Sequence, residues 1–189
     1  MSGTNDAYYF LVGVNDIPWN RIVHWYGRAT GFPELLAELR AADLTKQEYA
    51  INKILVNIEH QDGIIMATPF TLIFLFRSLS LTGVNKLGIL KAILKVVKAA
   101  KFQDGFYGSE NASPEIKNIQ DLITEKYLWP EFESEEQDEL NWEEYSYAEE
   151  YCSWIKYTLD IAKSFIGVWS VNYNKEEEEV AKQILQLMK

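Results

Sequence analysis

One segment, residues 69–79, is apolar on every side when it is drawn as a helix, and this limits the architectures open to the chain. Its large apolar side chains are Phe70, Leu72, Ile73, Phe74, Leu75 and Phe76. A helix that is apolar all round must be covered by other elements in every direction. A chain of 189 residues can supply that cover within one domain. The segment therefore predicts a layered helical protein with this helix at its centre.

Other parts of the chain also show helical periodicity. The longest apolar stripe, with residues three and four apart, runs from Tyr151 to Trp169. Similar stripes and helix-start signals predict the remaining helices over residues 33–40, 46–59, 83–100, 114–127, 145–171 and 175–188. Residues Ala7 to Val14 have the composition of one short strand, and residues 102–113 read as a loop.

Short loops between successive helices predict antiparallel helix hairpins. Three pairs are expected: 33–40 with 46–59, 68–79 with 83–100, and 145–171 with 175–188. The first two pairs begin about 36 residues apart, a period typical of helical solenoids. We therefore expect an all-α fold in a single domain, residues 1–189, built of stacked helix hairpins, with one short N-terminal strand.

Two segments carry a resemblance to a known group of proteins. The first is His24-Trp25-Tyr26-Gly27-Arg28-Ala29-Thr30 followed by Pro33 and Leu35-Leu36, and the second is Asn57-Ile58-Glu59-His60-Gln61 followed by Ala67-Thr68. Together they resemble the front of bacterial HEAT-like repeat proteins. The sequence departs from that pattern at Asp62, where glycine is usual, and at Pro69, where the proline is displaced. The resemblance implies a HEAT-like α-solenoid in residues 1–100 and brings no catalytic residues with it. Proteins similar to these include immunity proteins of toxin systems.

The charge of the chain is unevenly distributed. The formal net charge is −10, yet residues 1–100 carry 10 basic and 8 acidic side chains, whereas the acidic half, residues 101–189, carries 8 basic and 20 acidic ones. Residues 131–150 contain no lysine or arginine. Such a field repels nucleic-acid phosphates and attracts cationic partners. A solvated acidic loop is the plain alternative.

Aromatic residues are interleaved with these acids, as in binding surfaces and unlike purely solvating segments. Some of the rings could equally anchor the segment to the core. The predicted partner-binding residues are Glu131, Glu133, Glu135, Glu136, Asp138, Glu139, Trp142, Glu143, Glu144 and Tyr145.

Motifs for catalysis are missing from the sequence. It contains no phosphate-binding glycine loop, zinc-protease motif or nucleophile elbow. The only two histidines, His24 and His60, could form a metal site with Glu59 or Asp62, but half-buried hydrogen-bonding roles are the more economical interpretation. Cys152 is expected to pack, and no cofactor or metal is expected. The longest apolar run, residues 64–76, falls short of the roughly 20 residues that a membrane span requires, and no secretory signal is visible, so we expect a cytoplasmic protein.

Three functions remain open on these grounds. The first is a protein-binding inhibitor, an immunity protein whose acidic surface neutralises a basic toxin domain such as a nuclease. The second is a scaffold or self-associating repeat protein without inhibitory role. The third, a metal-dependent enzyme that uses His24 and His60, has the least support. We favour the inhibitor, which would be a monomer or weak homodimer that binds neither nucleic acid nor membrane.

Overall fold

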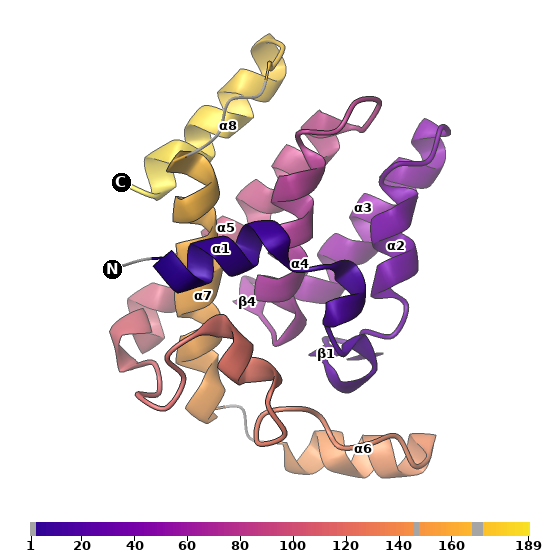
Figure 1. The fold of residues 1–189 in the computed structure, drawn as a ribbon, viewed down its shortest axis with the longest axis vertical. Helices are drawn as coiled ribbons and strands as arrows, with labels where there is room; N and C mark the ends of the chain where they lie inside the picture. Colours follow the sequence, from indigo (N-terminus) through magenta and orange to yellow (C-terminus); the bar gives the residue numbers. More distant parts are fainter. Residues whose placement is uncertain (1–2, 146–147, 168–171) are drawn as a thin grey trace.

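The computed structural model describes residues 3–145, 148–167 and 172–189, and the described residues are mostly helical (Figure 1). They form eight α-helices: α1 (Gly3–Leu11), α2 (Phe32–Glu38), α3 (Leu44–Ile58), α4 (Ala67–Ser78), α5 (Lys86–Tyr107), α6 (Glu135–Glu144), α7 (Ala148–Gly167) and α8 (Lys175–Leu187). The expected all-α class is confirmed, with two small antiparallel sheets added. None of the described helices is both long and apolar enough to cross a membrane.

Helix α4 forms the centre of the fold, as its sequence predicts. Every residue of α4 except Arg77 is buried. The helix packs against α3, α5, α7 and α1. In Figure 1 the α4–α5 pair lies between the α2–α3 pair on one side and helices α7 and α8 on the other. Helix α2 packs on α3 and α4 packs on α5, as expected, whereas the expected third pair differs: α7 and α8 both pack on α5 rather than mainly on each other.

Two β-hairpins that the sequence analysis missed precede α2 and α4. In the first, β1 (Val23–His24) pairs with β2 (Gly27–Arg28), and in the second, β3 (Glu59–His60) pairs with β4 (Gly63–Ile64). In each hairpin a histidine lies opposite a glycine. Strands of two residues are too short to show alternation in the sequence, which explains the omission.

The second hairpin is fixed to the helical layers. Gln61 and Asp62 occupy its turn with positive φ angles, so Asp62 takes the left-handed conformation that glycine usually provides. The buried carboxylate of Glu59 forms an ion pair of 2.5 Å with Lys95 on α5. This ion pair joins the hairpin to α5.

The expected strand over residues 7–14 is wrong, because Gly3–Leu11 is helix α1. Tyr9 and Val12 are buried, whereas Leu11 is 80% exposed. A helix that crosses α4 and α7 can bury one side of this aromatic segment, and tertiary packing of this kind overrides β-propensity.

The boundaries of the middle segment also differ from expectation. Helix α5 continues to Tyr107 through Asp104 and Gly105, so the expected loop begins only at Gly108, whose φ is +71°. The expected helix over residues 114–127 is wrong: turns there enclose a single short 3₁₀ helix, Ile119–Ile123. The buried residues Ile116, Ile119 and Leu122 are three apart, which suits 3.0 residues per turn better than 3.6.

The C-terminal helices agree with expectation where they are described. Helix α7 buries Trp154, Ile155 and Phe165, and the expected cap Asn174 accepts hydrogen bonds from the first backbone N–H groups of α8. Residues 146–147 and 168–171, with Trp169 at the end of the stripe, lie outside the described residues.

Candidate functional site

The acidic segment, residues 129–145, contains the helix α6, which the sequence analysis did not expect. The Ser134 side chain accepts a hydrogen bond of 3.1 Å from the Gln137 backbone N–H and so caps α6. Glu135, Glu136 and Asp138 lie in its first turn, where the helix dipole favours negative charge. No residue of α6 is buried. Without an apolar stripe, the helix left no periodic signal in the sequence.

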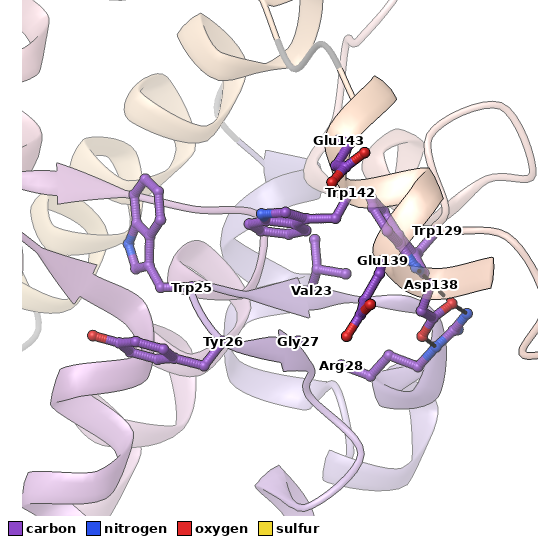
Figure 2. Close-up of a pocket in the computed structure, with 10 residues that line it drawn as sticks. All are labelled: Val23, Trp25, Tyr26, Gly27, Arg28, Trp129, Asp138, Glu139, Trp142 and Glu143. Atoms are coloured by element: carbon purple, nitrogen blue, oxygen red, sulfur yellow. Dashed lines mark hydrogen bonds and ion pairs between the residues drawn. The ribbon is translucent and has the colours of Figure 1, made fainter. Parts of the chain in front are cut away.

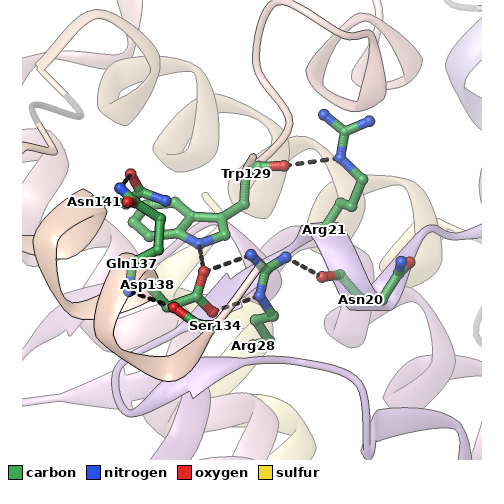
Figure 3. Close-up of polar contacts among 8 residues, drawn as sticks. All are labelled: Asn20, Arg21, Arg28, Trp129, Ser134, Gln137, Asp138 and Asn141. Carbon is green, nitrogen blue, oxygen red and sulfur yellow. Dashed lines mark hydrogen bonds and ion pairs between the residues drawn. The ribbon is translucent and has the colours of Figure 1, made fainter. Parts of the chain in front are cut away.

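One carboxylate of α6 is held by an arginine from the first hairpin. Arg28 donates from Nε and Nη2 to the two oxygens of Asp138, at 2.6 and 2.5 Å (Figure 3). The third nitrogen, Nη1, donates to the Asn20 carbonyl at 2.6 Å. Arg28 and Asp138 side chains are only 10% and 22% exposed, and the hydrogen bonds from Arg28 lower the pKa of Asp138. This partly buried pair fixes α6 to strand β2.

Trp129 provides the second attachment of α6. Its backbone exchanges two hydrogen bonds with Arg21, from Trp129 N–H to the Arg21 carbonyl and from Arg21 Nε to the Trp129 carbonyl. Its indole N–H donates to Asp138 at 3.3 Å, and its ring contacts the rings of Trp142 and Tyr145 at centroid distances of 5.7 and 4.9 Å. Tryptophan and tyrosine in this segment therefore anchor the helix, an outcome that the sequence analysis left open.

Helix α6 and the first hairpin enclose a pocket of about 350 Å³ (Figure 2). Aromatic rings and carboxylates dominate its wall. The hairpin contributes Val23, Trp25, Tyr26, Gly27 and Arg28, and the acidic segment contributes Trp129, Asp138, Glu139, Trp142 and Glu143. Figure 2 shows Trp142 between the Trp25 ring and Trp129, with the Glu139 and Glu143 carboxylates on different sides of it.

The second hairpin supports the pocket from behind. The backbone N–H of Trp25 donates to the backbone carbonyl of Asn57, at the end of α3, at 3.1 Å. The Trp25 indole lies against Gly63 of the second hairpin. A Cβ atom added to Gly63 would stand 3.0 Å from Cζ2 of Trp25 and 3.1 Å from the His60 carbonyl oxygen. Gly63 thus sets the position of one aromatic wall.

We expect Gly63→Ala to lower the free energy of unfolding by about 1–2 kcal/mol, because the added methyl group overpacks Trp25 and the hairpin backbone. The measurement is urea unfolding of the wild type and the variant. Gly105→Ala is the matched control: nothing lies within 4 Å of its added Cβ in α5, so this change should stabilise the helix. Equal stability of the Gly63 variant and the wild type would contradict the contact.

The two histidines lie near the pocket, and both contact Tyr26. His24 Nδ1 accepts a hydrogen bond from the Tyr26 N–H at 3.1 Å, and His60 Nδ1 lies 3.2 Å from the Tyr26 hydroxyl oxygen. Within the described part of the chain, no three histidine, cysteine, aspartate or glutamate side chains gather closely enough to hold one metal ion. Both histidines thus have hydrogen-bonding contacts, but only His24 is half-buried as expected, whereas His60 is exposed.

Burial, reinforced by the charge of Lys53, lowers the pKa of His24 to about 4. The unfolded chain binds this proton near pH 6.5, so the stability that His24 contributes is complete above that pH. It is lost as the pH falls from about 6.5 to about 4. We expect His24→Gln to flatten the fall of the urea midpoint over this range. A wild type and variant with parallel profiles would contradict the assignment, and His60→Gln controls for the loss of an imidazole.

The predicted binding residues fall into three groups in the structure. Glu139, Trp142 and Glu143 line the pocket, as does Asp138, whose carboxylate is engaged by Arg28. Glu131 pairs with Arg21 at 3.1 Å, and Tyr145 packs on Trp129. The remaining residues, Glu133, Glu135, Glu136 and Glu144, are exposed.

Sequence reasoning missed the contribution of the first hairpin to the pocket. Nothing in the spacing of Trp25, Tyr26 and Arg28 indicates an acidic partner more than a hundred residues away in the sequence. Arg28, the one charged residue among the aromatic residues of this hairpin, was the available signal.

Comparisons of the chain with protein-family models, with curated proteins and with solved structures found no match. A function for this chain must therefore be argued from its own residues.

Proposed function

We propose that this chain is a protein-binding inhibitor, an immunity protein that neutralises a basic bacterial toxin domain by covering its functional surface with α6. The observation that carries the proposal is that α6 is anchored by one carboxylate, Asp138, while its other carboxylates are exposed on a fixed helix: Glu135, Glu136, Glu139, Glu143 and Glu144. A fixed array loses less conformational entropy on binding than a flexible acidic loop. Its charge also steers a cationic partner into the encounter.

The electrostatics of α6 favour a cationic partner over mere solvation. The helix has six acidic residues and no lysine or arginine. Glu135 and Glu139, and likewise Glu139 and Glu143, are four residues apart, a spacing at which like charges cost about 0.2–0.5 kcal/mol per pair. Glu143 and Glu144 lie in the last turn, where the helix dipole disfavours negative charge. A cation bound to this face would relieve both costs.

We further propose that the front half is a HEAT-like α-solenoid. The support comes from two successive units, each with a hairpin whose histidine and glycine face each other, followed by a helix: β1–β2 with α2, and β3–β4 with α4. Stacked repeats of this kind offer extended surfaces for protein partners.

The inhibitor role is tested by capture from a lysate of the source cell, followed by an activity assay. The immobilised wild type should retain one basic protein at low salt and release it near 0.5 M salt, where exposed charges are screened. The captured protein's own activity should then fall to zero at equimolar wild-type chain. A triple variant, Glu135→Lys, Glu139→Lys and Glu143→Lys, should neither retain nor inhibit it. A captured protein whose activity is unchanged by the chain would contradict inhibition.

A further inference from the structure

The pocket beside α6 combines aromatic faces with carboxylates that have no cationic partner. Neither Glu139 nor Glu143 forms an ion pair with any lysine or arginine among the described residues. Both line the same cavity as the rings of Trp25, Tyr26 and Trp142 (Figure 2). Cations are attracted to aromatic faces and to carboxylates alike. The pocket is therefore complementary to a positively charged group.

The chain itself shows how an arginine fits this surface. The Arg28 guanidinium donates two hydrogen bonds to the Asp138 carboxylate and lies 5.4 Å from the centroid of the Phe132 ring. About one helical turn further along, Trp142 stands beside Glu139 and Glu143 in a similar combination of ring and carboxylate. The acidic helix thus already binds one guanidinium, and it presents a second set of groups of the same kind towards solvent.

We propose that the pocket receives an arginine side chain of a basic protein partner. Its guanidinium stacks on the face of the Trp142 ring towards Glu139 and donates hydrogen bonds to that carboxylate, while the charge of Glu143, on the other side of the ring, adds to the attraction. Arginine suits the site better than lysine because its planar group stacks on rings and offers several donors in fixed directions. A cavity of about 350 Å³ has room for one such side chain rather than a folded segment. This assignment deepens the proposed function and rests on it for the identity of the partner.

The test uses the full chain and three capped peptides, acetyl-Gly-X-Gly-amide, in which X is arginine, lysine or citrulline. Citrulline matches the shape of arginine but has no charge. Binding is followed by tryptophan fluorescence and by the indole N–H signals of Trp25 and Trp142 in two-dimensional NMR. We expect the arginine peptide to shift both signals with a dissociation constant of about 1 mM at low salt, lysine to bind several-fold more weakly, and citrulline not to bind.

Two variants separate the pocket from the general acidity of α6. Glu139→Gln with Glu143→Gln should weaken binding of the arginine peptide about tenfold, because it replaces both negative charges with neutral amides and leaves the ring packing intact. Glu136→Gln with Glu144→Gln is the matched control, because it makes the same change of charge on the same helix away from the pocket and should change binding less than about twofold. Trp142→Leu should also weaken binding, with the fold checked by circular dichroism.

The results distinguish the pocket from the general acidity of α6. Any one of three results would overturn the pocket assignment: equal binding of the citrulline and arginine peptides, equal loss of binding in the two double variants, or no shift of either indole signal. If that happens while the triple lysine variant still loses the basic partner, the inhibitor proposal stands without the pocket. If the arginine peptide binds as expected but no basic protein is captured, the pocket stands and the inhibitor proposal fails.

Discussion

Replacing Glu135, Glu139 and Glu143 with lysine is expected to weaken the complex with the basic partner at least about 100-fold. Each reversal turns an attraction into a repulsion at the interface, and about 1 kcal/mol per exposed charge gives this factor. The association rate should fall most, since the exposed carboxylates steer the encounter. Isothermal titration and surface plasmon resonance at several salt concentrations measure both quantities.

The triple variant is designed to leave the fold intact. It spares Asp138, because reversing that residue would place a lysine against Arg28 and detach the helix. The free variant should be about as stable as the wild type, because the like-charge pairs at 135/139 and 139/143 persist as lysine pairs, while a lysine at position 139 gains an attraction to Glu136 three residues earlier. The control exchanges three exposed glutamates of α8, Glu176, Glu178 and Glu179, for lysine and makes the same change of net charge. Loss of affinity in the control equal to that in the α6 variant would contradict a localised binding surface.

Arg28→Met is expected to lower the free energy of unfolding by about 2–3 kcal/mol, because it leaves the partly buried Asp138 carboxylate without its cation. The larger effect of this substitution is on α6 itself, which loses its main attachment to the hairpin. Helix α6 has 10 residues and none of them buried, and an isolated helix shorter than about 12 residues is marginal in water. The release of α6 should weaken partner binding even though the Arg28 guanidinium itself is engaged by Asp138.

The pH dependence of this effect follows from Asp138. Arg28 lowers the pKa of its carboxyl group, so the stability from the pair is complete above the ordinary aspartate value near 4. This stability is lost as the pH falls through the lowered pKa of Asp138. The urea midpoints of wild type and Arg28→Met should therefore differ at pH 7 and converge in acid. Arg40→Met removes an exposed arginine and serves as the control. A constant difference at every pH would contradict the Arg28–Asp138 pair as its source.

The sequence was informative where local periodicity and burial agree. The apolar segment at residues 69–79 identified the central helix because no other environment suits it, and the stripe after Tyr151 identified α7. Residues 7–14 misled because their composition favours a strand, while packing of Tyr9 against neighbouring layers selects a helix.

The candidate site was only half visible in the sequence. The run of acids and interleaved aromatic residues identified the acidic side of the pocket. The other side depends on two-residue strands and on the contact between Arg28 and Asp138, which are distant in sequence. Whether Trp129 anchors or binds was likewise decided by a long-range contact, its backbone pairing with Arg21. Patterns within one segment carry no information about such pairings.

Hydrogen exchange of the backbone amides in α6 tests most directly whether the acidic segment is an anchored helix. If α6 is held by Arg28 and Trp129, the amides of residues 139–144 in the free wild type at neutral pH should exchange at least about tenfold more slowly than those of an unstructured peptide. The protection should vanish in Arg28→Met while α4 and α7 keep theirs. Exchange of these amides at the unstructured rate in the wild type would contradict a fixed acidic surface and return the segment to a solvated loop.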